Sequence, residues 1–300
     1  LLWAMIPMIA ASVLRIFVAA LGKPSYATAI TLLAIAVNAL GNWVLVFGNF
    51  GAPAMGIEGS ALSSILTSLA MLLAYVAVIG GDRKLRRFHV FGRWWRPEWK
   101  RLGEMLALGI PISLTVLAEA GLFSGAAFLM GRIGEAELAA HTIALNIAAL
   151  AFQVPYGINQ AATIRVGYHF GAGDRAAIGR AGWSALVLSV GFMVLTAGAM
   201  VLAPYPLIGL YAGEATAANA AMLALAVQYL AVAAAFQLFD AAQAVAAGAL
   251  RGLQDTRMPL AIALFGYWAV GFTVSIWLGF YTPLEGIGVW IGLAIGLVVV

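Results

Sequence analysis

Residues 105–130 read MLALGIPISLTVLAEAGLFSGAAFLM, an apolar run with a single charged side chain, that of Glu119. A helix needs about 20 mostly apolar residues to cross the hydrocarbon core of a bilayer, so the run predicts a membrane-spanning helix. Glu119 falls near the middle of that helix, where a charged side chain is costly in contact with lipid. Its position therefore favours a helix that faces a cavity or a binding site, and the alternative is a protonated acid that is hydrogen-bonded between helices.

The composition of the whole chain agrees with a membrane protein. Of the 300 residues, 64% are hydrophobic and 9% are charged, and the mean hydropathy is +1.00. An ordinary soluble domain has roughly 25% charged residues. This high share of hydrophobic residues and low share of charged residues exclude a soluble globular protein, a disordered chain and a nucleic-acid-binding protein as descriptions of the whole chain. The absence of cysteine excludes a disulfide framework and a thiolate metal site.

Nine apolar stretches are long enough, or nearly long enough, to span a membrane. They are 1–21, 25–47, 56–79, 105–130, 137–168, 177–203, 218–250, 258–281 and 287–300. Turn residues such as those of Pro204-Tyr205-Pro206 separate them, and none alternates with the period of a strand. We therefore predict an all-α polytopic membrane protein. Because both ends of the chain lie inside apolar runs, we expect an internal piece of a longer protein.

The placement of the cations predicts the orientation. Most of the 16 Lys and Arg residues fall in one set of alternate loops, whereas the other set holds mainly acids such as Glu135, Glu137, Glu214 and Glu285. By the positive-inside rule, the cation-rich side is cytoplasmic.

The longest polar segment, 81–104, is predicted to be a cytoplasmic basic linker. It contributes Arg93 and Arg96 to the cation-rich set, and its Pro97 suits the start of a helix. One helical face would carry Phe88, Phe91, Trp95, Trp99 and Leu102. The segment is either an interfacial element on the anionic leaflet or a plain basic loop.

An internal repeat predicts two lobes. Leu2–Arg15 and Leu238–Arg251 share leucine, alanine and arginine at matching positions, and both run toward the cytoplasmic side. The match continues to Gly56 and Gly286. A parallel repeat implies lobes related by an axis along the membrane normal. We divide the chain into the remainder of an N-lobe (1–80), the linker (81–104) and a C-lobe of six helices (105–300), with about three spans expected before the first residue.

Polar residues inside the C-lobe spans mark a candidate site. Asp240 is a second acid within a span, and Gln237 and Gln243 share its helical face. A polar stripe on 137–168 consists of Thr142, Asn146 and Gln153. The stripe has two interpretations, hydrogen bonding between helices or the lining of a hydrated cavity for a cation. We expect Glu119 and Asp240 to share that cavity, near Asn146.

No motif predicts catalysis. The sequence lacks a Gly-x-Ser-x-Gly, His-Glu-x-x-His or P-loop pattern, so we do not expect an enzyme. His141 and His169 lie near opposite ends of their span without the spacing of a metal site, and we interpret both as interfacial.

Several of these stretches resemble the multidrug and toxic compound extrusion (MATE) family, NorM type. They are LGIPI (108–112) with Glu119, GINQAATIRVGYHFGAGD (157–174), and Phe239-Asp240 through the exit loop at 248–256. The resemblance covers essentially the whole chain and implies helices four to twelve of a twelve-helix, two-lobe transporter. It implies that Glu119 and Asp240 couple transport to a cation, with Na⁺ as a possible ligand of both. Some sodium-coupled members have tyrosine where this chain has Phe236. The resemblance therefore leaves both Na⁺ and H⁺ as candidates for the coupling ion.

The expected function is multidrug efflux by cation antiport, with alternating access of the two lobes. The alternative is a related lipid-linked oligosaccharide flippase, whose anionic substrate would call for cations in the spans. The expected partners are small cationic or aromatic drugs, the coupling cation and the lipid bilayer, with no cofactor, no nucleic acid and a monomeric state. The expected location is the bacterial inner membrane, with several passes through it.

Overall fold

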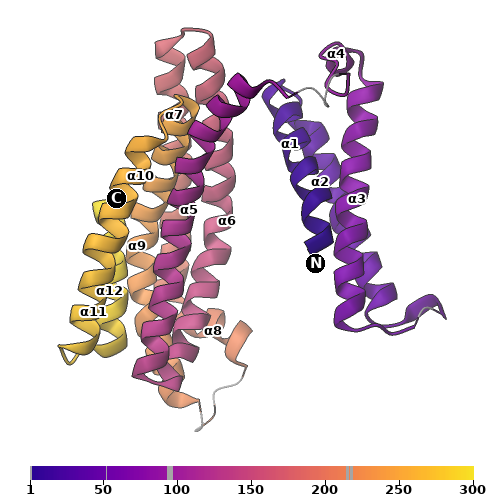
Figure 1. Ribbon diagram of the computed structural model, residues 1–300. Helices are drawn as coiled ribbons and strands as arrows, with labels where there is room; N and C mark the ends of the chain where they lie inside the picture. The colour runs from indigo at the N-terminus through magenta and orange to yellow at the C-terminus, as the bar shows by residue number, and fades with distance from the viewer. Residues whose placement is uncertain (1, 52, 93–96, 214–215, 217–218) are drawn as a thin grey trace. The chain divides into compact units, whose positions relative to one another are not determined.

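The computed structural model describes residues 2–51, 53–92, 97–213, 216 and 219–300, and every regular element in these ranges is helical (Figure 1). The chain divides into two compact units, Leu1–Glu98 and Trp99–Val300. Four residues named in the sequence analysis fall outside the described ranges: Arg93, Trp95, Arg96 and Glu214.

Within the described residues, eight helical segments are long and apolar enough to cross a membrane. They are α1 (Leu2–Ala20), α2 (Pro24–Leu45), α3 (Ile57–Gly81), α5 (Trp99–Ile133), α6 (Glu135–Gly171), α7 (Arg175–Leu202), α9 (Ala220–Gly252) and the segment Arg257–Phe280. The ninth predicted stretch is the shorter apolar helix α12 (Glu285–Val299). The prediction of an all-α chain is therefore confirmed, and each predicted apolar stretch is helical in the described residues, with eight long enough to cross a membrane.

The eighth segment is not one regular helix. It consists of α10 (Arg257–Ala263), a π-helical turn region η2 (Leu264–Phe272) and α11 (Thr273–Phe280). The apolar pattern predicts its length but carries no signal for the change of hydrogen bonding. π-Helical stretches are rare, and those that occur are often found at functional sites.

Three short helices join the long ones. They are η1 (Asn49–Gly51), α4 (Arg83–Arg86) and α8 (Pro204–Ala212). The interpretation of Pro204-Tyr205-Pro206 as a turn is wrong, because these residues open α8. Proline is favourable in the first turn of a helix, where its missing N–H would have no partner.

The N-terminal unit packs α3 against both α1 and α2. Its buried core consists of Ala11, Leu14, Val18, Ile30, Tyr75, Ile79 and Leu85. Leu85 belongs to α4, so the start of the basic segment is anchored to the core of this unit.

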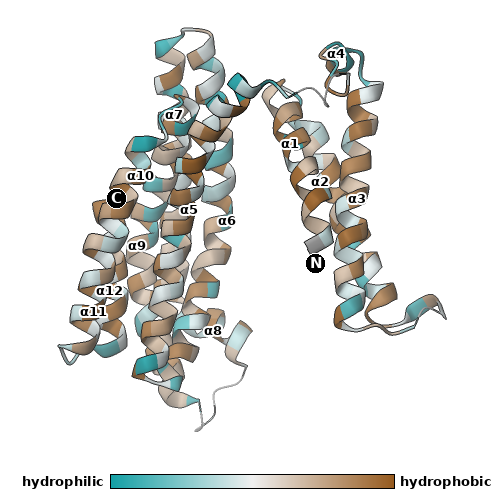
Figure 2. Ribbon diagram, viewed as in Figure 1, coloured by the Kyte–Doolittle hydropathy of each residue, from teal (hydrophilic) through white to brown (hydrophobic). Residues whose placement is uncertain are grey.

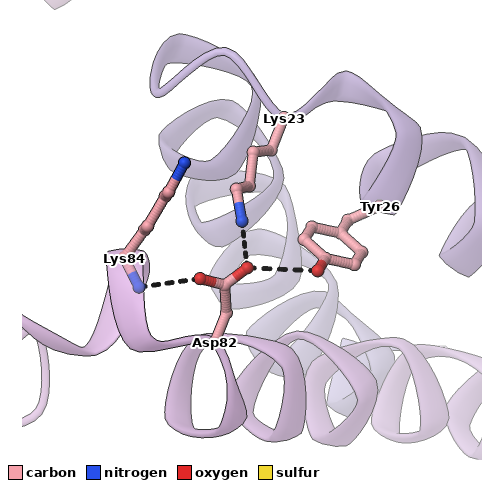
Figure 3. Close-up of polar contacts among 4 residues, drawn as sticks. All are labelled: Lys23, Tyr26, Asp82 and Lys84. Carbon is pink, nitrogen blue, oxygen red and sulfur yellow. Dashed lines mark hydrogen bonds and ion pairs between the residues drawn. The ribbon is translucent and has the colours of Figure 1, made fainter.

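A polar cluster closes one end of the N-terminal unit (Figure 3). The Lys23 ammonium forms an ion pair with the Asp82 carboxylate, and the Tyr26 hydroxyl donates to the same oxygen at 3.1 Å. The backbone N–H of Lys84 donates to the other oxygen at 2.8 Å, so Asp82 caps α4. The hydrogen bond from Lys23, with those from Lys84 and Tyr26, lowers the pKa of Asp82 to about 2.

The C-terminal unit is built around α9, which packs against α6, α7 and α12. The Trp290 ring stacks on Tyr229 and Phe236, with centroid distances of 5.8 and 5.7 Å. His141 meets the same ring edge-on at 5.4 Å and is completely buried. The prediction of an interfacial His141 is therefore wrong, because the ring packs into this aromatic cluster.

Polar residues concentrate toward the helix ends, and the long helices are mostly apolar along their middle parts (Figure 2). Many large apolar side chains are exposed at the surface of the described units, among them Leu32, Leu195 and Leu202. An exposed apolar surface of this extent is suited to lipid.

Close glycine contacts occur near the starts of α3 and α12. A Cβ on Gly59 of α3 would lie 2.4 Å from the Leu45 carbonyl oxygen of α2. A Cβ on Gly288 of α12 would lie 2.5 Å from the Leu278 carbonyl oxygen of α11. In both places a glycine near the start of one helix allows it to approach the end of the preceding helix.

Candidate functional site

Glu119 and Asp240 line the same cavity in the C-terminal unit. Glu119 lies on α5 and Asp240 on α9, and α6 packs against both helices. The cavity has a volume of about 280 Å³ and is lined by Glu119, Phe123, Leu145, Ala148, Ala149, Phe152, Phe236, Gln237 and Asp240. The small residues Ala148 and Ala149 on α6 leave room between the two acidic helices.

The polar atoms of this cavity are oxygens with few partners. Asp240 is buried and Glu119 is half-buried. Within the described residues, Asp240 Oδ1 and Gln237 Oε1 are buried without a hydrogen-bond donor. The amide nitrogen of Gln237 is oriented by Met193, whose carbonyl oxygen accepts its hydrogen bond at 3.4 Å. Such oxygens can bind a proton or a hard cation.

Phenylalanine rings form much of the remaining wall. Phe123, Phe152 and Phe236 come from three different helices and surround the two acids. The lining described here contains no Lys and no Arg. Aromatic faces attract cations, so this lining suits a positively charged aromatic ligand. Sequence analysis did not single out Phe123 or Phe152, since phenylalanine is common throughout the spans.

The polar stripe on α6 does not line this cavity. The side chains of Thr142 and Asn146 each donate to a carbonyl oxygen one turn earlier at 2.8 Å, and that of Gln153 does so at 3.3 Å. All three are exposed on the C-terminal unit. The helix backbone therefore accepts the hydrogen bonds of all three side chains. Contrary to the expectation, Asn146 does not line the cavity of the two acids.

Gln243 also lies apart from the two acids. Its amide donates to the Tyr267 hydroxyl of η2, and it lines a separate small cavity with Thr115 and Pro259. Of the polar residues proposed from the sequence, Gln237 thus lines the same cavity as Glu119 and Asp240. Gln243 lies about one turn from Asp240 along α9 and lines a different cavity.

The π-helical region supports the helix that carries Glu119. The Trp268 indole donates to the Ala118 carbonyl oxygen at 3.2 Å. A Cβ on Gly121 would lie 2.9 Å from the Trp268 ring, and a Cβ on Gly125 would lie 2.8 Å from the Phe272 ring. Two glycines one turn apart thus receive two aromatic rings one turn apart. The spacing can be read in the sequence, but only the contact between the two segments shows that these glycines and rings are partners.

The acids do not belong to a larger metal site. Within the described residues, no group of three or more His, Asp and Glu side chains lies close enough to hold a metal ion. The features together define a class: a helical membrane protein with two acids in one largely apolar, aromatic-walled cavity.

Comparisons with known proteins specify this class further. The profile of the MatE family matches residues 111–278, more than half of the chain. The chain is 49% identical over 298 residues to the probable multidrug resistance protein NorM of Mesorhizobium japonicum, covering 99% of this chain and 64% of the relative. It is 41% identical over 290 residues to the multidrug resistance protein NorM of Burkholderia vietnamiensis, covering 97% and 62%. The chain therefore spans less than two thirds of the length of these relatives.

Solved structures share the fold. The crystal structure of the eukaryotic MATE transporter AtDTX14 has a TM-score of 0.84 at 20% identity, covering 99% of this chain and 65% of that one. The crystal structure of MATE in the bent conformation has a TM-score of 0.77 at 18% identity, covering 93% and 59%. The chain belongs to the MatE family.

Proposed function

We propose that this chain contains the cation-coupling part of a multidrug efflux antiporter of the bacterial inner membrane. The observation that carries the proposal is the shared cavity of Glu119 and Asp240. Two separate acids in hydrocarbon would each need polar partners to offset the cost of burying a carboxyl group, whereas one polar cavity provides such partners for both. The names of the NorM relatives support multidrug substrates.

The coupling step follows from competition for the two acids. A Na⁺ ion or a proton that binds the carboxylates reduces their attraction for a cationic drug, and the drug is then released. Gln237 Oε1 is available beside Asp240 to help hold the ion. Alternating access between two lobes would expose this cavity to each side of the membrane in turn.

The lining of the cavity favours cationic over anionic substrates. An anionic lipid-linked oligosaccharide would require cations, and the described lining has acids and phenylalanine rings instead. The flippase alternative therefore receives no support from this cavity.

The test uses cells that express the complete gene and accumulate a fluorescent cationic dye. Glu119→Gln and Asp240→Asn remove one charge each with little change in shape, and both are expected to abolish cation-driven efflux with membrane insertion intact. Glu104→Gln on the exposed part of α5 is the matched control and should pump normally. Normal efflux by both neutral variants would contradict the proposal.

A further inference from the structure

A second cavity lies between α6 and α7, near the turn that joins them. It has a volume of about 430 Å³ and shares no lining residue with the cavity of the two acids. Arg165 and His169 of α6 and Arg180 and Ser184 of α7 supply its polar groups. Its remaining lining residues are apolar. The proposed transport function uses none of these side chains.

The two arginines lie at nearly the same depth. The helices are joined by the short turn around Gly173, so residues at equal distances from it along the chain lie side by side. Arg165 precedes that glycine by eight residues and Arg180 follows it by seven, which places both about 11 Å from the turn at 1.5 Å per residue. Ile158 and Leu188, which also line the cavity, are each about 11 Å deeper by the same count.

The charges in this cavity are not neutralised by the protein around them. Arg165 and Arg180 are both exposed, and among the described residues no hydrogen bond or ion pair involves either of them. Two guanidinium groups above an apolar wall suit a ligand that has an anionic head and an apolar tail. Guanidinium groups bind phosphate oxygens well because their donors form a planar fork.

We propose that this cavity binds the phosphate of an anionic phospholipid, with Arg165 and Arg180 on the phosphate oxygens and an acyl chain along Ile158 and Leu188. The part of α7 that follows Arg180 and ends at Leu202 has about the length of a membrane crossing, so Arg180 lies at headgroup level. This end of α7 is on the cation-rich side of the chain, and the cytoplasmic leaflet is the anionic one. Basic pockets between membrane helices on that side are suited to such headgroups.

Native mass spectrometry of the complete, detergent-solubilised protein tests the proposal, with dioleoylphosphatidylglycerol as the lipid probe. Dioleoylphosphatidylcholine and inorganic phosphate are the comparison ligands. We expect phosphatidylglycerol to bind in preference to phosphatidylcholine and to resist displacement by millimolar phosphate. Arg165→Gln or Arg180→Gln should weaken its binding about fivefold, and the double variant about 25-fold. Arg175→Gln is the matched control, because Arg175 is exposed like the two cavity arginines but does not line the cavity, and this variant should bind normally.

A second variant tests the shape of the cavity with both charges in place. Ala161→Phe fills the space beside Arg165 and should reduce lipid binding at least as strongly as one arginine variant. Normal binding by this variant, or an equal loss in Arg175→Gln, would show diffuse charge attraction and overturn the proposal. Displacement of the lipid by inorganic phosphate would overturn it as well, because the site would then recognise free phosphate.

Discussion

Asp82 illustrates how a single residue can hold the end of a helical unit together. Its carboxylate joins Lys23 and Tyr26, at the junction of α1 and α2, to the start of α4. Its pKa of about 2 is below the ordinary value of 3.8, so the folded state favours the ionised form. The stabilisation from these contacts is therefore fully present above about pH 3.8 and is lost as the pH falls toward 2.

The variant Asp82→Asn distinguishes the contribution of the ion pair with Lys23 from that of the helix cap at Lys84. Asparagine caps helices about as well as aspartate, so the contact with the Lys84 N–H should persist while the attraction to Lys23 is lost. We expect faster hydrogen exchange in residues 18–30 and 82–88 at neutral pH, measured by mass spectrometry and corrected for the intrinsic rate. The variant should also lose the change in protection that the natural protein shows between pH 4 and 2. Protection equal to that of the natural protein at both pH values would contradict this role.

At the scale of the helical element, glycine contacts determine how closely the helices pack. On α12, a Cβ at Gly292 would lie 2.3 Å from the Ser275 backbone nitrogen of α11, and backbone cannot move aside as a side chain can. A Cβ at Gly198 on α7 would meet nothing within 4 Å. The two glycines therefore serve as a test and its matched control.

Gly292→Ala is expected to destabilise the C-terminal unit by about 1–3 kcal/mol, the usual cost of overpacking. Gly198→Ala should be neutral or stabilising by about 0.5–1 kcal/mol, since alanine is the better helix former. Thermal unfolding in detergent, followed by fluorescence, compares the two with the natural protein. An unfolding temperature that stays unchanged in Gly292→Ala would show that α11 and α12 are not packed as described.

The elements also show what the sequence could predict. Length and hydropathy were sufficient for the eight segments long enough to cross a membrane, because a bilayer sets a minimum length for each crossing. The energetic cost of an acid in hydrocarbon was sufficient to select Glu119 and Asp240. The polar stripe of Thr142, Asn146 and Gln153 could not be placed in this way, because short polar side chains in a helix can bond to their own backbone. The pairing of Gly121 with Trp268 depends on contacts distant in sequence, which periodicity does not contain.

At the scale of the whole molecule, the distribution of cations predicts which helix ends are cytoplasmic. The chain has no cysteine, so single cysteines can report on each end. In a cysteine-free form of the complete protein, a membrane-impermeant maleimide on intact cells should label Glu135→Cys and Tyr281→Cys. It should label Arg83→Cys and Arg175→Cys only after the cells are permeabilised. Labelling of Arg175→Cys in intact cells would contradict both the predicted orientation and the proposed cytoplasmic lipid site.

The most direct test of the central claim is ion-driven transport by the complete protein in proteoliposomes. A cationic dye is loaded, and a Na⁺ gradient and a pH gradient are imposed separately on the natural protein, Glu119→Gln, Asp240→Asn and Glu104→Gln. The shared cavity predicts that at least one gradient drives dye movement by the natural protein and by Glu104→Gln, whereas neither gradient drives it in the other two variants. Gradient-driven movement at the natural rate in both Glu119→Gln and Asp240→Asn would contradict the claim that these acids couple transport to a cation.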